Sequence, residues 1–236
     1  MTLQISARGT IRVLSTVALL LTLAHGVSAY WWHMDENRFS ELLVEKFSFE
    51  GEGNFPSFFS GALLLLAAGL FGLIARSARA GGRPGWGYWS GLSALFFFLT
   101  FDEAAQLHEK LDTDLIWASI ETTGFLAWPW VIIYGGLTLA FIVVYGAFWY
   151  RLPPFYRLRY GIAGALYVCA ALGFEMVEAN LYVTQGGVTP LYIVVASLEE
   201  VLEMVAIIAT IGLNMRYLSE EVPARFVFTA RDAMPA

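Results

Sequence analysis

Residues 95–109 read Leu95-Phe96-Phe97-Phe98-Leu99-Thr100-Phe101-Asp102-Glu103-Ala104-Ala105-Gln106-Leu107-His108-Glu109. An apolar run is followed almost at once by three carboxylates and a histidine. A charged side chain near the centre of a bilayer costs about 2.5 to 3.5 kcal/mol on insertion scales, so a membrane helix that keeps several must hide or use them. The stretch therefore predicts a membrane helix that carries an internal polar site.

The composition of the whole chain supports a membrane protein. Of 236 residues, 58% are hydrophobic and 14% are charged, whereas about 25% are charged in ordinary soluble domains. The net charge of -6 and the pI of about 5.1 argue against nucleic acid as a partner, because no basic stripe exists to neutralise phosphates. The single cysteine, Cys169, excludes an intrachain disulfide and a thiolate cluster.

Six apolar runs are long enough to cross about 30 Å of hydrocarbon as helices of about 20 residues, near 12–32, 56–76, 86–108, 127–150, 159–183 and 189–215. We expect an all-α polytopic membrane bundle of six transmembrane helices over residues 1–219, with outer loops at about 33–55 and 112–126 and a short cytoplasmic tail at 220–236. A cleaved signal peptide is the alternative for the first run, because Val27-Ser28-Ala29 is typical of a cleavage site. Its apolar character continues through Trp32, which favours a retained helix.

The arginines predict the orientation of these helices. They lie before the first run, between the second and third runs, between the fourth and fifth runs, and after the sixth run. These residues are Arg8, Arg12, Arg76, Arg79, Arg83, Arg151, Arg157, Arg159, Arg216, Arg225 and Arg231. The opposite connections are rich in Asp and Glu. Because short cytoplasmic loops carry an excess of Lys and Arg, we expect both termini in the cytoplasm and the acidic loops outside.

The outer loops carry local helix signals. Residues 38–49 place several apolar side chains roughly on one side, which predicts a short surface helix. Asn54 or Ser57, on either side of Pro56, is typical of the start of the next helix. Residues 112–127 have an amphipathic pattern that suits a helix lying along the outer membrane surface.

Three of the predicted spans carry acids within them. The members are Asp102, Glu103, His108 and Glu109 on the third run, Glu175 and Glu178 on the fifth, and Glu199, Glu200 and Glu203 on the sixth. Residues three or four apart share a helix face, so each group forms one polar stripe. The inferred orientation puts all three stripes in the outer half of the membrane, which predicts a shared site.

Several ionised carboxylates this close would repel, so the site needs protons, hydrogen bonds or a bound cation. We interpret it as a divalent metal site in the core of a helix bundle. Oxygen ligands with one certain nitrogen favour Fe, Mn, Zn, Mg or Ca over Cu(I). The predicted ligands are Asp102, Glu103, His108, Glu109, Glu175, Glu199 and Glu203, with Glu178 and Glu200 as the catalytic base or in support.

The alternatives to a metal site are structural. The acids of the third run could be the solvated outer end of that helix, and the acids of the fifth and sixth runs could pair between helices for packing alone. His25, about two turns from the outer end of the first run, is expected to be a packed and hydrogen-bonded histidine rather than a ligand.

Three motifs resemble those of a family of uncharacterised bacterial multi-pass membrane proteins. They are Gly51-Glu52-Gly53-Asn54-Phe55-Pro56-Ser57-Phe58-Phe59-Ser60, Phe101-Asp102-Glu103-Ala104-Ala105-Gln106-Leu107-His108-Glu109 and Leu198-Glu199-Glu200-Val201-Leu202-Glu203-Met204. The resemblance implies a multi-pass protein of the bacterial inner membrane, and it implies no activity.

Three functions remain open from the sequence. The first is a metal-dependent membrane hydrolase or oxidoreductase for a lipid or other apolar substrate, in which the metal activates water or polarises an oxygen and a Glu acts as general base. The second is a proton- or cation-coupled transporter that uses the same acids, although the inner halves of the spans offer few polar residues for a path. The third is a non-catalytic subunit of a membrane complex. Membrane lipids are expected partners in each case, and a membrane protein partner or a homo-oligomer stays open.

Overall fold

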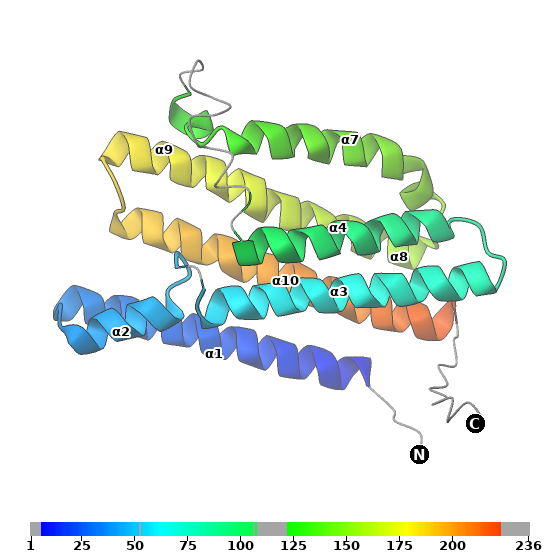
Figure 1. Cartoon of the computed structure of the whole chain (residues 1–236), viewed down its shortest axis with the longest axis horizontal. Helices are drawn as coiled ribbons and strands as arrows, with labels where there is room; N and C mark the ends of the chain where they lie inside the picture. The colour runs from blue at the N-terminus through cyan, green and yellow to red at the C-terminus, as the bar shows by residue number, and fades with distance from the viewer. Residues whose placement is uncertain (1–5, 52, 106, 108–121, 223–236) are drawn as a thin grey trace, which may run out of the picture.

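The structure is a computed structural model of the chain that describes residues 6–51, 53–105, 107 and 122–222. Every regular element in these ranges is a helix, as the sequence predicts. Long helices run roughly along the longest axis of the molecule (Figure 1). The elements are α1 (Ala7–Met34), α2 (Arg38–Phe47), α3 (Phe55–Ala80), α4 (Trp86–Ala105), the 3-10 turn η1 (Gly124–Leu126), α7 (Trp130–Tyr150), α8 (Pro154–Val168), the π-helical η2 (Cys169–Phe174), α9 (Glu175–Gln185) and α10 (Pro190–Glu220).

Four of the described helices are long and apolar enough to cross a membrane: α1, α3, α7 and the continuous rod Pro154–Gln185 formed by α8, η2 and α9. The chain is therefore a helical membrane protein. The predicted third and sixth runs form α4 and α10, which carry acids and are outside this group of four. At a rise of 1.5 Å per residue these two helices are about 30 and 46 Å long.

Local sequence sets the start of α3. The Asn54 side chain accepts a hydrogen bond from the Ser57 backbone N–H (3.1 Å), and the Ser57 hydroxyl accepts one from the Asn54 N–H (3.2 Å). Pro56 lies in the first turn, where its missing N–H costs nothing. The predicted helix start and the predicted surface helix, which is α2, are both confirmed. The amphipathic segment predicted at 112–127 lies outside the described residues up to 121, as does the tail from 223.

Helix α10 is the central element of the fold. It packs against α1, α3, α8, η2 and α9. The main core forms where Leu63 and Leu64 of α3 meet Ile207 and Ile211 of α10. Helix α7 is held much less closely: its main contacts are with α8 and η2, and Val143 on its outer side is 81% exposed. This loose packing leaves space between α7 and its neighbours.

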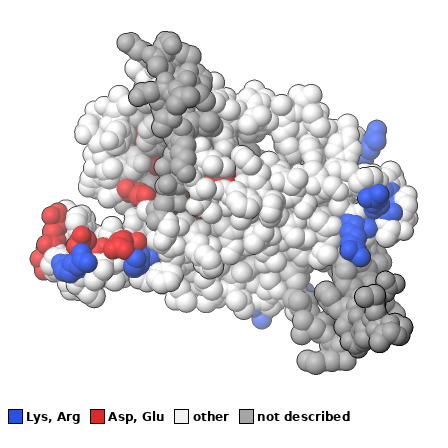
Figure 2. All heavy atoms as spheres, viewed as in Figure 1, with Lys and Arg blue, Asp and Glu red and all other residues white. Residues whose placement is uncertain are grey.

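Charge is divided between the two ends of the bundle. The start of α1, the end of α10 and the connections α3–α4 and α7–α8 lie at one end (Figure 1). Arginine gathers at that end, whereas acids gather around α2 at the other end, beside the Arg38–Glu41 and Lys46–Glu45 ion pairs (Figure 2). The structure thus has one arginine-rich end and one acidic end.

Helices α4 and α7 touch at the arginine-rich end through aromatic side chains. Tyr88 stacks on Phe148 with ring centroids 4.8 Å apart. The Tyr145 hydroxyl donates to the Tyr88 carbonyl (3.3 Å). Gly91 makes room for this contact, because a Cβ atom at position 91 would collide with the Tyr145 hydroxyl.

Replacing Gly91 with Ala is expected to lower the free energy of unfolding by about 1 to 3 kcal/mol, because overpacking forces the Tyr145 ring away from α4. The better helix propensity of Ala offsets at most about 1 kcal/mol. Thermal unfolding in detergent measures the effect. Gly87→Ala on the same helix is the control, since its Cβ would meet open space. Equal melting temperatures for the two variants would contradict the packing argument.

Candidate functional site

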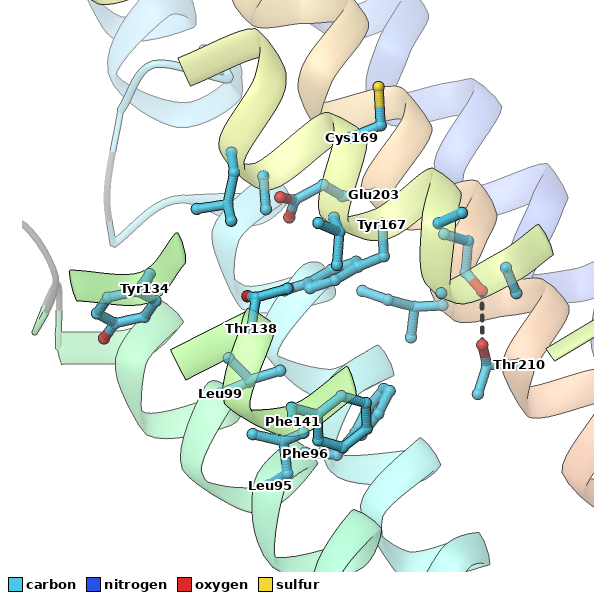
Figure 3. A pocket seen from close by; sticks show the side chains of 18 of the residues that line it. Leu95, Phe96, Leu99, Tyr134, Thr138, Phe141, Tyr167, Cys169, Glu203 and Thr210 are labelled. Atoms are coloured by element: carbon cyan, nitrogen blue, oxygen red, sulfur yellow. Dashed lines mark hydrogen bonds between the residues drawn. The ribbon is translucent and has the colours of Figure 1, made fainter. Parts of the chain in front are cut away.

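A cavity of about 1080 Å³ lies between α4, α7, the rod α8–η2–α9 and α10. Figure 3 shows Leu95, Phe96 and Leu99 of α4 and Phe141 of α7 along it. Its other lining residues include the acids Asp102, Glu103, Glu175, Glu178, Glu199, Glu200 and Glu203. The structure therefore brings every predicted site residue of the described ranges to one cavity. His108 and Glu109 lie outside the described residues.

Three of these acids form a tight group. Glu175, Glu178 and Glu199 each offer a carboxylate oxygen, and the three oxygens lie within 4.8 Å of one another. Glu178 is only 4% exposed. Its Oε1 atom has no hydrogen-bond partner in the part of the chain that the structure describes. Since an unsatisfied buried acceptor costs about 1 to 3 kcal/mol, this oxygen is well suited to bind a cation or a proton.

A π-helical segment positions two members of this group. Residues 169–174 form η2, and Glu175 begins α9 directly after it. One extra residue in a turn rotates the following helix faces by about 100°, so η2 decides which way Glu175 and Glu178 point. Single π-helical turns inside α-helices occur often at functional sites. The apolar run predicted over 159–183 contained no signal for this interruption.

Asp102, Glu103 and Glu203 line the same cavity as the group of three. Asp102 is 5% exposed, and the Tyr134 hydroxyl donates to its Oδ1 atom (2.9 Å). Tyr167 lines the same cavity as Glu103 and Glu203. In Figure 3 the Tyr167 ring lies between Glu203 and Leu99.

Three tyrosines of the site were missed by the sequence reasoning. Tyr134 donates a hydrogen bond to Asp102, and Tyr167 and Tyr192 line the cavity together with the acids. Tyrosine near the end of a membrane helix is usually an interface anchor, which is how Tyr192 would be interpreted. Their position along the helix could have identified two of them. Tyr134 and Tyr192 lie near the starts of α7 and α10, which are at the acidic end of the bundle.

The segment between α2 and α3 borders the acidic end of the cavity through Glu50. Although much of Glu50 faces solvent, partial burial of its carboxyl raises its pKa, and the charge of Glu178 adds to this effect. The preceding residue holds the segment in place: the Phe49 N–H donates to Nδ1 of His25 (3.1 Å), and the two rings stack at 4.5 Å.

His25 also reaches α10. Because its Nδ1 accepts a hydrogen bond, its Nε2 carries the proton and donates to the Ser197 hydroxyl (2.8 Å). Ser197 in turn donates to the Ile193 carbonyl (2.6 Å). His25 is 6% exposed. The prediction of a packed, hydrogen-bonded histidine is confirmed, and its role is to tie the Phe49 segment to α1 and α10.

Comparison with known proteins gives a family but no activity. Residues 13–216 match a family described as a domain of unknown function (DUF8692). No curated protein and no solved structure matches the chain. The family match is consistent with the family of unknown function that the three motifs suggested. Since it covers most of the chain, the protein belongs to the DUF8692 family.

Proposed function

We propose that the protein binds a divalent metal ion at Glu175, Glu178 and Glu199 and acts as a metal-dependent membrane enzyme on a lipid or other apolar substrate. The observation that carries this proposal is the approach of three carboxylates to within 4.8 Å around a buried, unpartnered Glu178 oxygen. The charges on three such groups repel unless protons or a cation balance them. A cation does so and at the same time gives the buried Glu178 carboxylate a partner.

The separation of the oxygens suits one shared ion. Two ligands on opposite sides of Ca²⁺ are about 4.8 Å apart, and two on opposite sides of Mg²⁺ are about 4.2 Å apart, given their usual metal–oxygen distances. Three oxygens within 4.8 Å of one another are therefore close enough to share one ion of either kind. An oxygen-only ligand set favours Ca²⁺, Mg²⁺ or Mn²⁺ over Zn²⁺ or Fe²⁺.

The remaining residues divide into supporting roles. A bound divalent ion would polarise a substrate oxygen or lower the pKa of a water molecule. Glu178 belongs to the ligand set in this assignment, rather than acting as base as the sequence had suggested. Glu200, which lines the same cavity, is our candidate for the general base. Asp102, Glu103 and Glu203 line the same cavity, and in this proposal they orient what binds next to the ion.

We further propose that α1, α3, α4, α7, the rod α8–η2–α9 and α10 form six spans of a bacterial inner membrane with both termini in the cytoplasm. The gathering of arginine at one end supports this orientation, since cytoplasmic loops carry the excess of basic residues. The metal site then lies in the outer half of the membrane. Cysteine labelling from each side of the membrane, at positions 36 and 82 in a Cys169→Ser background, tests it.

The test of the metal site is elemental analysis of the protein purified under metal-replete conditions. We expect about one divalent ion per chain in the wild type and less than about a tenth of that in Glu175→Gln/Glu199→Gln. Glu36→Gln is the matched control, because Glu36 is an exposed acid at the same end of the bundle. Metal-free wild-type protein, or equal metal in the double variant, would refute the assignment.

A further inference from the structure

The cavity extends far beyond the acids. Along α4 its lining residues run from Trp89 to Glu103, a helix length of about 21 Å. Along α7 they run from Trp130 to Trp149, about 28 Å. One leaflet of a bilayer contributes about half of the roughly 30 Å hydrocarbon thickness. The cavity is therefore at least as long as a lipid acyl chain.

The lining of the long part is apolar. Below the acids it consists mainly of aliphatic and aromatic side chains, with Thr138 and Thr210 among the few hydroxyl groups. The Thr210 hydroxyl is already used, because it donates to the Ala206 carbonyl (2.9 Å). A cavity of this composition favours a hydrocarbon chain over a polar solute, since a polar group placed there would lose hydrogen bonds to water.

The cavity also reaches the outer surface of the bundle between α4 and α7. In the middle of α4 and α7, Phe98 (44%), Leu137 (59%) and Ile142 (57%) line the cavity and are exposed as well. They lie between the Tyr134–Asp102 hydrogen bond and the Tyr88–Phe148 stack, at both of which the two helices touch. A side opening at this level faces the lipid tails, so a chain can enter without crossing water.

We infer that the cavity holds one acyl chain of a bilayer phospholipid, with its tail toward the arginine-rich end and its phosphate at the acids. This inference rests on the proposed function at one point: a cation must lie between the phosphate and the carboxylates, which would otherwise repel it. The orientation matches a lipid of the outer leaflet, whose head lies at the outer surface and whose tail points toward the membrane centre. The substrate class is thus a phospholipid bound from within the membrane.

The experiment uses the full chain in vesicles that contain phosphatidylethanolamine with a photoactivatable diazirine in one acyl chain. After illumination, mass spectrometry locates the labelled residues. We expect labels on Leu95, Leu99 and Phe141, which line the cavity, in addition to the outward-facing Leu139 and Val143. Labels confined to the outward-facing residues would overturn the inference.

Two glycines of α7 provide a matched pair of variants. Gly146 lines the cavity and Gly136 is not among its described lining residues, and a Cβ at either position meets nothing within 4 Å. Gly146→Trp is expected to reduce the cavity labels at least tenfold, whereas Gly136→Trp leaves them unchanged. Gly164→Phe fills the cavity from α8 and repeats the test if Gly146→Trp does not fold. Equal cavity labelling in the filled and control variants would also overturn the inference.

Metal content measured on the same samples separates this inference from the proposed function. Cavity labels together with bound metal support both. Bound metal without cavity labels overturns the lipid inference alone. Cavity labels in metal-free wild type overturn the metal site and the phosphate contact, and they support the placement of the acyl chain.

Discussion

Replacing Glu178 with Gln is expected to stabilise the metal-free protein and to abolish its stabilisation by divalent ions. In the absence of a cation, the buried Glu178 carboxyl lies beside those of Glu175 and Glu199. Gln keeps the shape of the side chain and cannot ionise, so the repulsion within the group falls and the free energy of unfolding should rise by about 1 to 3 kcal/mol. With a cation present, the same change removes one of three ligands, and we expect the affinity to fall at least 100-fold.

Thermal unfolding in detergent, with EDTA or with increasing Ca²⁺, Mg²⁺ or Mn²⁺, measures both effects. An ion at 100 times its dissociation constant stabilises the wild type by about 2.7 kcal/mol. The variant should show almost none of this gain. Glu36→Gln should follow the wild type in every condition. A Glu178→Gln protein that is less stable than wild type in EDTA would indicate that this carboxyl stabilises the bundle through packing contacts, and would contradict a ligand role.

The sequence allowed the acidic end of the site to be predicted because two simple rules combine there. The arginines predict the direction of each helix, and the position of an acid within its apolar run then gives its depth. This was enough to predict that Asp102, Glu178 and Glu199 belong to one region, and all three line one cavity. The same rules do not say which acids touch, because that depends on helix rotation.

The rotation of each helix about its own axis could not be predicted from the sequence. The π-helical η2 rotates the following helix so that Glu178 points toward Glu175 and Glu199. In an uninterrupted α-helix over the same run these side chains would point in other directions. The cavity was unpredictable for a related reason. It exists because α7 packs loosely along α4, and the volume left between two apolar helices depends on side-chain fit that periodicity does not describe.

The structure also relates stability to function in physical terms. The core of the bundle, where α3 meets the second half of α10, is built from fully buried aliphatic side chains such as Leu63, Leu64 and Ile211. The side of the bundle that faces α7 has instead a large cavity, clustered carboxylates at one end of it, and a weakly held α7. Each of these features lowers stability, and together they suit a site that must admit an apolar ligand and a cation. We therefore expect substitutions near the acids to be tolerated by the fold more readily than substitutions in the α3–α10 core.

Replacing His25 with Ala is expected to lower the free energy of unfolding by about 3 kcal/mol. The change removes a ring that is 6% exposed and stacked on Phe49, and deletion of a buried aromatic ring typically costs about 3 to 5 kcal/mol. It also leaves the Phe49 N–H without its acceptor at His25 Nδ1, which costs about 1 to 3 kcal/mol when the donor stays buried. Partial collapse of the neighbouring segment reduces the sum.

Thermal unfolding and metal titration of the same variants separate the contribution of His25 to stability from any role in metal binding. His33→Ala is the control, because His33 is an exposed residue at the end of the same helix; its melting temperature should equal that of the wild type. His25→Phe keeps a ring for stacking but lacks the acceptor, so it should recover part of the stability and no more. Metal affinity of the folded His25→Phe protein should change less than threefold, since His25 holds the Phe49 segment and is no ligand. A larger loss of affinity, with the fold intact, would instead place this histidine at the metal.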